Sequence, residues 1–329
     1  MVRVDGIGDA LACAPLVAAL RDAGHEVGAL LSTRNRDAFA ARAFARTHVV
    51  ERIPWPRHGT TPATRVRALG DAKAAGYDVA LVASEESDAY AFARDAGVAQ
   101  RIGFINGWQK PLKSLALRRY LTRALVRPAS AAHSSEHEVD VLFRLGAGLH
   151  DESEPTEDLA RLRPLVLDAT PPRGARVLLQ IDAKYTAAGL TLSAFGDIAA
   201  ALRAAGGEVV AAGADEDLGR VFAARTGVPF VPTPTVAEWK AAIASARVLI
   251  APDSGAVHVA GMTGTPSVVL FPRRPHVERD ALRWQPWAAP SRALIADGVR
   301  AHEPHASDDA PLAEAVVRCV AAIAARGDA

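Results

Sequence analysis

Cysteine, lysine and aromatic residues are all scarce in this chain of 329 residues. Its two cysteines, Cys13 and Cys319, lie near opposite ends, so the sequence offers neither a disulfide framework nor a Cys-x-x-Cys metal site. This cysteine usage predicts a reducing, cytoplasmic environment. We interpret the few lysines and the many alanines as a bias of genomic base composition.

A surplus of charge and a long apolar run are missing as well. The 38 basic residues nearly balance the 37 acidic ones, which argues against a generic nucleic-acid-binding protein. Half of the residues are hydrophobic, too many for a disordered chain. The most apolar stretch, 247–271, is interrupted by Asp253, His258 and Pro266, and the residues before Gly6 are too few and too charged for a signal peptide. We therefore expect a soluble protein.

Short β-branched segments alternate with alanine-rich helical segments in two separate parts of the chain. Strands are expected at 2–4, 26–31, 48–50, 79–82 and 101–104, and again at 177–181, 208–212, 248–250 and 267–271. Helices are expected between them and at 35–46, 112–126, 136–145 and 311–325. Such alternation is typical of βαβ units and parallel sheets.

An irregular segment with prolines and acids, 151–174, separates the two alternating parts. We predict an α/β protein of two doubly wound, Rossmann-like domains, 1–165 and 166–329. Ligands of such sheets bind at the carboxyl ends of the strands, so a cleft between two sets of carboxyl ends is expected.

The first candidate site follows the first expected strand, in Gly6-Ile7-Gly8-Asp9-Ala10-Leu11. Glycines let the backbone approach a ligand, and the helix that opens at Asp9 offers free N–H groups. A dinucleotide fingerprint is disfavoured, because Leu11 stands at its third glycine and the second strand ends without the acid that would hold a ribose. Asp9 is then either a helix cap or a general base at the mouth of the cleft.

The second candidate site lies between the strands 248–250 and 267–271. A tight turn presents Asp253, Ser254 and the N–H of Gly255, and His258 follows one helical turn later. Backbone N–H groups and a serine hydroxyl at a helix N-terminus suit a diphosphate. The alternative is a plain helix cap at Asp253-Ser254 with His258 in the core, and the residues by themselves leave both interpretations open.

Two further clusters contain potential metal ligands. Asp215-Glu216-Asp217 resembles an Asp-x-Asp metal motif, but acids that stabilise a helix N-terminus explain it better. Glu216 is kept as a weak candidate for a contact with the ribose or base of a bound nucleotide. His302-x-x-His305 is an isolated pair, and we predict no metal site.

The stretch 101–127 carries seven basic residues and no acid: Arg101, Lys110, Lys113, Arg118, Arg119, Arg123 and Arg127. Apolar and aromatic residues are interleaved with them: Trp108, Leu112, Leu115, Tyr120 and Leu121. This pattern fits a face that contacts an anionic membrane surface or an anionic acceptor. It fits equally the solvated face of an ordinary helix packed on the core.

The second site resembles the nucleotide-sugar signature of glycosyltransferase family 9, whose best-known members are the ADP-heptose–lipopolysaccharide heptosyltransferases. The matching residues are Asp253-Ser254-Gly255-x-x-His258-x-Ala260 and Gly264-x-Pro266-x-x-x-Leu270-Phe271. Three other segments are similar to motifs of that family and follow in its order: Gly8-Asp9 before Ala14-Pro15-Leu16, His137-Glu138-Val139-Asp140, and Arg283-Trp284-x-Pro286-Trp287. The similarity thus runs through nearly the whole chain.

The resemblance implies a GT-B architecture with the acceptor in the N-terminal domain and the nucleotide sugar in the C-terminal one. It implies a metal-independent, inverting transfer, here of a heptose from ADP-heptose to a hydroxyl of a lipopolysaccharide core or another glycolipid. Asp9 matches the catalytic base, and Asp253, Ser254, Gly255 and His258 match the residues that hold the diphosphate. The last helix, 311–325, is expected to cross back onto the N-terminal domain. No cofactor besides the nucleotide sugar is implied.

The chain departs from the family pattern in two places. No lysine stands in 187–191, where the family places one, and Lys184 is the candidate to supply that charge. The strand after the signature ends in Pro272-Arg273-Arg274 instead of a glycine, and arginines can clamp phosphate. Two alternatives follow: a transferase with another nucleotide sugar or acceptor, or a nucleotide-binding relative without catalysis. The missing lysine favours the latter, and the retained Asp9 opposes it.

Overall fold

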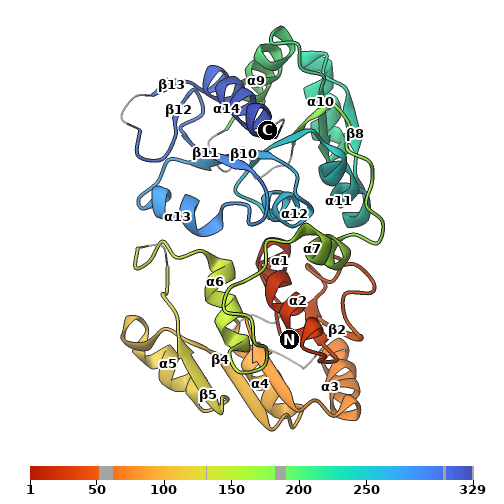
Figure 1. Cartoon of the computed structure of the whole chain (residues 1–329), viewed down its shortest axis with the longest axis vertical. Coiled ribbons are helices and arrows are strands. Elements are labelled where there is room, and N and C mark those ends of the chain that lie inside the picture. The colour runs from red at the N-terminus through yellow and green to blue at the C-terminus, as the bar shows by residue number, and fades with distance from the viewer. Residues whose placement is uncertain (52–61, 131, 182–189, 307–308, 328–329) are drawn as a thin grey trace. The chain divides into compact units, whose positions relative to one another are not determined.

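The computed structural model describes residues 1–51, 62–130, 132–181, 190–306 and 309–327. The chain divides into two compact units, 1–157 and 158–329. Each unit contains a parallel sheet with helices packed on it, which confirms the α/β expectation (Figure 1).

The N-terminal unit has a parallel sheet in Rossmann order. Its strands are β1 (Gly28–Ser32), β2 (Arg46–Val50), β3 (Val79–Val82), β4 (Gln100–Ile105) and β5 (Arg123–Val126). The pair β1–β2 and the ladder β3–β4–β5 are joined by Val2, which bridges both Leu30 and Val82. Counting the segment at Val2 as the first strand, the order is 3-2-1-4-5-6, the order of doubly wound sheets.

The helical segments of this unit are short. They are α1 (Ile7–Leu11), α2 (Ala14–Asp22), α3 (Ala63–Ala75), α4 (Ser87–Asp95), η1 (Gly107–Gln109), α5 (Pro111–Arg118), α6 (Glu138–Phe143) and η2 (Arg144–Gly146). Two expectations are corrected. Residues 35–45 form turns and bends in place of a helix, and the Asn35 amide instead bonds the backbone of Ser32 and Arg3. The expected helix 112–126 ends at Arg118, and its last part is the edge strand β5.

The C-terminal unit repeats the same strand order in a larger sheet. Its strands are β6 (Val177–Gln180), β7 (Val209–Gly213), β8 (Phe230–Pro232), β9 (Val248–Pro252), β10 (Ser267–Pro272), β11 (Ser291–Ala296), β12 (Arg300–His302) and β13 (Ala310–Pro311). The order is β13-β12-β11-β10-β9-β6-β7-β8, parallel from β8 to β11. The last two strands extend one edge in antiparallel fashion.

The helices of the C-terminal unit include one in the segment 151–174, which we expected to be irregular. They are α7 (Leu159–Val166), α9 (Leu192–Ala204), α10 (Glu216–Thr226), α11 (Val236–Ser245), α12 (Gly255–Thr263), α13 (Val277–Trp284) and α14 (Leu312–Gly327). Helix α7 packs on α12, and Arg163 Nε donates to the Thr263 carbonyl at 2.8 Å. The division between the units therefore falls before α7 and not at 165/166.

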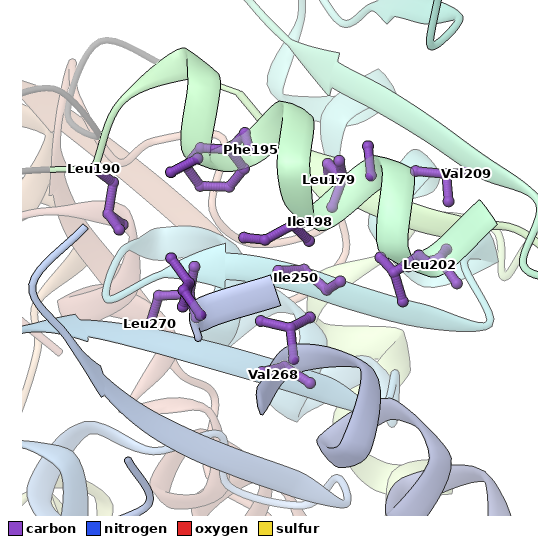
Figure 2. Close-up of a cluster of buried hydrophobic side chains, with 14 of the residues drawn as sticks. Leu179, Leu190, Phe195, Ile198, Leu202, Val209, Ile250, Val268 and Leu270 are labelled. Atoms are coloured by element: carbon purple, nitrogen blue, oxygen red, sulfur yellow. The ribbon is translucent and has the colours of Figure 1, made fainter. Parts of the chain in front are cut away.

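The core of the C-terminal unit lies between the sheet and α9. Figure 2 shows Phe195, Ile198 and Leu202 of α9 above strand residues that include Ile250 and Leu270. Each fully buried side chain of this size contributes about 1.5–3 kcal/mol. The same core includes Leu312, Ala315, Val316, Cys319 and Ile323 of α14. The structure thus assigns α14 to the C-terminal unit, where it packs on α9.

Among the helices that the structure describes, none combines the length and the apolar character that crossing a membrane requires.

Candidate functional site

The strand order locates one candidate site in each unit. In a doubly wound sheet the ligand crevice lies where the order reverses, outside the carboxyl ends of the strands. In the N-terminal sheet the order reverses between the segment at Val2 and its neighbour β3, and Asp9 follows the segment at Val2. In the C-terminal sheet the order reverses between the paired strands β6 and β9, and Asp253 and Ser254 directly follow β9. Each predicted site thus lies at the carboxyl ends of the strands of its own sheet, where doubly wound sheets usually bind ligands.

Asp9 is a fixed carboxylate that still reaches solvent. It is the third residue of α1, where its Oδ2 accepts the Gly6 N–H at 3.0 Å. Its Oδ1 accepts from Arg3 Nη2 at 2.9 Å, and 36% of the side chain is exposed. A Cβ on Gly6 would approach Asp9 Oδ2 to 2.9 Å, so the glycine permits the close turn. Asp9 therefore caps the helix, and it also presents an oriented carboxylate that a substrate can reach.

Beneath Asp9, the buried guanidinium of Arg3 joins two carboxylates. Only 2% of the Arg3 side chain is exposed, its Nε lies 3.3 Å from Asp5 Oδ2, and its Nη1 donates to the Ala83 carbonyl. Burial by itself would lower the pKa of Arg3, but Asp5 and Asp9 raise it, so the group stays charged. Burial raises the pKa of Asp5, against the opposing effects of Arg3 and of a hydrogen bond with Ser84.

Sequence reasoning missed Arg3 and Asp5 as site residues. Their spacing could have revealed them. Arg3 and Asp5 carry opposite charges in an otherwise apolar first segment, and residues at i and i+2 of an extended segment project from the same face.

A second buried ion pair comes from the segment that resembles the family's mid-chain motif. Glu138 has no exposed surface, and its Oε1 lies 3.0 Å from Nη2 of Arg127, which is 3% exposed. The same nitrogen lies 2.9 Å from Oε1 of the half-exposed Glu85. His137 caps α6 by accepting the Val139 N–H at 3.2 Å. Arg127 is therefore a buried structural cation and does not belong to an exposed basic face.

A cavity of about 940 Å³ opens in the N-terminal unit. Part of its lining follows the strands β1, β2 and β3: Thr33, Arg34, Glu51, Glu85, Glu86 and Ser87. Helix α5 and the residues after it contribute the rest, including Leu112, Lys113 and Arg119. The cavity is large enough for a sugar or a drug-sized ligand. Its mixed acidic and basic lining offers hydrogen-bond acceptors and cations on different walls.

The C-terminal site is a turn at the start of α12. Ser254 is the N-cap, and its Oγ accepts the Ala256 N–H at 3.4 Å. Asp253 Oδ2 lies 3.5 Å from Arg274 Nη2, and Arg274 Nε lies 3.1 Å from Asp280 Oδ2. The structure therefore brings Asp253, Ser254 and Gly255 together at a helix N-terminus with an arginine beside them, which is an arrangement that can hold an anion.

His258 is buried one turn further along α12, against the aromatic–proline segment. It is 6% exposed, and its ring meets Trp284 edge-on with 5.7 Å between the centroids. A Cβ on Gly261 would come within 2.6 Å of the Trp287 backbone nitrogen, so only glycine lets α12 approach that segment so closely. Two motifs of the sequence, the signature helix and Arg283–Trp287, thus form one packed unit that fixes the His258 ring.

The remaining candidate residues are placed as follows. Lys184 lies outside the described residues. Glu216 Oε2 lies 2.5 Å from Arg220 Nη2, and Asp215 caps α10 by accepting the Leu218 N–H at 3.0 Å, so this acidic run begins a helix as expected. Asp309 pairs with Arg273 and His302 at 2.7 and 2.8 Å. Within the described part of the chain, no three His, Cys, Asp or Glu side chains are arranged to hold a metal ion.

Comparisons with known proteins identify relatives by structure only. No model of a protein family and no curated protein sequence matches the chain. The similar solved structures include a glycosyltransferase family 9 protein and two heptosyltransferases. A glycosyltransferase family 9 protein from Veillonella parvula DSM 2008 has a TM-score of 0.66 at 14% identity, over 90% of this chain and 84% of that one.

The other two are heptosyltransferases from E. coli. Heptosyltransferase WaaC with ADP has a TM-score of 0.73 at 15% identity, over 98% of each chain. ADP-heptose lps heptosyltransferase II has a TM-score of 0.66 at 16% identity, over 100% of this chain and 98% of that one. These likenesses confirm the fold that the family resemblance implied, a GT-B architecture of two Rossmann-like units along the whole chain.

Proposed function

We propose that this protein is an inverting, metal-independent glycosyltransferase of family 9. It transfers a heptose from ADP-heptose to a hydroxyl of a lipopolysaccharide-core or other glycolipid acceptor, in the cytoplasm. The observation that carries the proposal is the placement of the two motif sites. Asp9 and the turn Asp253–Gly255 lie at the reversal points of the two sheets, in a chain that has the fold of heptosyltransferases. The similar WaaC was solved with ADP and with ADP-2-deoxy-2-fluoro heptose.

In the proposed reaction Asp9 takes the proton of the acceptor hydroxyl. The acceptor oxygen forms a bond with the anomeric carbon while the bond between that carbon and the diphosphate oxygen breaks. The electron pair of the broken bond leaves with ADP, and attack from the opposite face inverts the anomeric centre. The bonds from Arg3 and Gly6 hold the Asp9 carboxylate in one orientation, and its exposed part is the side that meets the hydroxyl.

The departing diphosphate is stabilised by fixed dipoles and cations in place of a metal. We assign this role to the Ser254 hydroxyl, the first N–H groups of α12 and the ring of His258. Asp253 holds the turn and orients Arg274 toward the anion. Lys184 supplies a further cation, and Glu216 contacts the ribose or base. The Glu216–Arg220 pair is exposed and weak, so Glu216 can exchange it for a nucleotide contact.

The acceptor binds in the N-terminal cavity. Carboxylates are good acceptors for sugar hydroxyls, and Glu51 and Glu86 line this cavity, which lies in the same unit as Asp9. Lys113 and Arg119 on its other wall suit an anionic group on the acceptor.

A second candidate function is nucleotide binding without transfer, or transfer from another nucleotide sugar. The sequence favours it at 187–191, where the family's lysine is missing.

A thermal-shift panel of ADP, UDP, GDP and CDP, first without metal and then with Mg²⁺, tests the donor. A ligand at 100 times its Kd stabilises the fold by about 2.7 kcal/mol. We expect stabilisation by ADP alone, unchanged by Mg²⁺, and release of ADP from ADP-heptose when an acceptor is added. Stabilisation by UDP or GDP instead would refute the donor. Nucleotide binding with no turnover on any acceptor would establish the non-catalytic alternative.

A further inference from the structure

Residues 108–126 include four large apolar side chains that are mostly exposed. Trp108 is 95% exposed, Leu112 83%, Leu115 73% and Val126 67%. Leu112 and Leu115 lie at i and i+3 on one face of α5, and Trp108 lies in η1, the short 3-10 helix that precedes α5. Helix α5 uses its other face, Ser114 and Leu117, to pack on the unit. The outward face is thus a second apolar stripe that the fold of the unit does not need.

Val126 belongs to the same patch. A Cβ on Gly107 would lie 3.5 Å from Val126 Cγ1, so Val126 of β5 stands directly beside η1. In Figure 1, α5 and β5 (yellow) lie at the side of the N-terminal unit opposite to β2 and α3. Exposed apolar side chains gathered in one patch mark an interaction surface, whereas single ones do not.

Five basic residues of the same segment have no carboxylate partner among the described residues. They are Lys110, Lys113, Arg118, Arg119 and Arg123. Arg119 donates to the Tyr120 hydroxyl and Arg123 to the Ala147 carbonyl, both neutral groups. The segment 101–127 contains no acid of its own, and its buried Arg127 is paired with Glu85 and Glu138. A tryptophan and two leucines in one segment with these five Lys and Arg residues are complementary to the headgroup region of an anionic bilayer.

The patch adjoins the proposed acceptor cavity. Leu112 belongs to the apolar stripe, and Leu112, Lys113 and Arg119 also line the cavity. A polar group carried by a lipid in the contacted surface would therefore enter the cavity beside α5.

We propose that this patch, Trp108, Leu112, Leu115 and Val126 with the Lys and Arg residues of the same segment, docks the protein on the surface of a bilayer that contains anionic lipid. The apolar side chains insert at the headgroup level, and the cations bind the negative surface. The choice of a lipid partner rests on the glycolipid acceptor of the proposed function, but the docking itself needs neither donor nor acceptor.

Co-sedimentation of the full chain with vesicles tests the proposal. We expect binding to phosphatidylcholine vesicles that contain phosphatidylglycerol, little binding to phosphatidylcholine alone, and release near 1 M salt, where the Debye length is about 3 Å. The double variant W108S/L115S should bind on the order of tenfold more weakly. K110Q/R118Q should lose about fivefold for each cation. None of these four residues lines the cavity.

The control is V299S, a substitution at a side chain 73% exposed in the C-terminal unit, which should bind vesicles like the unsubstituted protein. Equal binding to both vesicle types, or wild-type binding by W108S/L115S, would overturn the proposal. So would a dimer in solution that W108S/L115S converts to a monomer, because the patch would then be a protein interface. Stabilisation by ADP without vesicles should be unchanged in W108S/L115S. If ADP stabilised neither the unsubstituted protein nor any variant, the proposed donor would be refuted, but the result of the vesicle experiment would still hold.

Discussion

Arg3 and Asp9 form an ion pair with 2.9 Å between Nη2 and Oδ1, in which the cation is buried and the carboxylate is open to solvent. The cation has a fixed place, because it also bonds Asp5 and the Ala83 carbonyl. The pair therefore fixes the direction of the Asp9 carboxylate and leaves 36% of its side chain exposed, on the side where we propose that the acceptor hydroxyl binds.

Replacing Asp9 by Asn should remove transfer and retain the fold. General bases contribute about 10²–10⁴-fold to a rate, and a loss of that size is expected in ADP release from ADP-heptose with acceptor. Asn keeps the hydrogen-bonding shape of the cap, and Arg3 keeps Asp5 as a partner, so the melting temperature and the stabilisation by ADP should change little. Asp217→Asn, at a side chain 93% exposed, is the control. Transfer by Asp9→Asn at a rate near that of the control would exclude Asp9 as the base.

Replacing Glu138 by Gln should destabilise the N-terminal unit strongly. The change leaves the buried Arg127 with only the half-exposed Glu85, and breaking a buried pair costs about 3–5 kcal/mol. Glu136→Gln removes an exposed partner of Arg144 and should cost no more than about 1 kcal/mol. Urea unfolding of both variants measures the difference. Equal costs would mean that the Glu138 pair contributes no more than a surface one.

Replacing Gly261 by Ala should loosen the C-terminal site. The new Cβ would meet the Trp287 backbone at 2.6 Å, so the segment that carries Trp284 has to move away from α12 and His258. We expect a loss of about 1–3 kcal/mol and weaker stabilisation by ADP. Gly70→Ala in α3, where no atom lies within 4 Å, should instead stabilise by about 0.5–1 kcal/mol. A Gly261→Ala protein with unchanged stability and ADP response would refute this packing role.

Asp95 should stabilise the N-terminal unit in a pH-dependent way. Burial by itself would raise its pKa, but hydrogen bonds from Arg94 and Arg65 outweigh burial and hold the pKa below its ordinary value of 3.8. A carboxylate with a lowered folded pKa contributes stability above the unfolded pKa and loses it as the pH falls through the folded pKa. The melting temperature of Asp95→Asn should therefore lie below that of the wild-type protein at pH 6, with the gap closing below pH 3.8. A gap that is constant with pH would contradict the charge-based account.

The sequence was sufficient for the strands of both sheets that are buried on both faces. Segments such as 177–180 and 248–252 are runs of apolar residues between turn signals, and such runs read plainly as core strands. The edge strand β5 was missed because its sequence does not alternate between apolar and polar residues. In the structure Arg123 and Val126 are exposed and the two residues between them are half-buried, so no face of the strand is clearly apolar. The packing of α14 on α9 could not be predicted for another reason: an amphipathic sequence shows which face a helix buries but not which element it packs against.

The candidate site divides in the same way. Asp9, Ser254 and His258 were found because each lies in a short motif. Glu138 and Arg127 lie in different motifs, and only the tertiary fold brings them together. The pairing of Arg3 with the Ala83 carbonyl spans two strands that are neighbours only once the sheet has formed. Local patterns identify residues that act near their own turn, whereas buried ion pairs depend on strand order.

Helix α7 also determines at which residue the chain can be divided into fragments. Leu159 lies against Gly264, close enough that a Cβ there would come within 2.4 Å of its side chain, and Arg163 bonds the last turn of α12. A fragment that begins after Val166 would strip this cover from the end of the signature helix and expose apolar surface. Chimeras that exchange halves with a related enzyme should therefore be joined at 157/158, so that each C-terminal half brings its own α7.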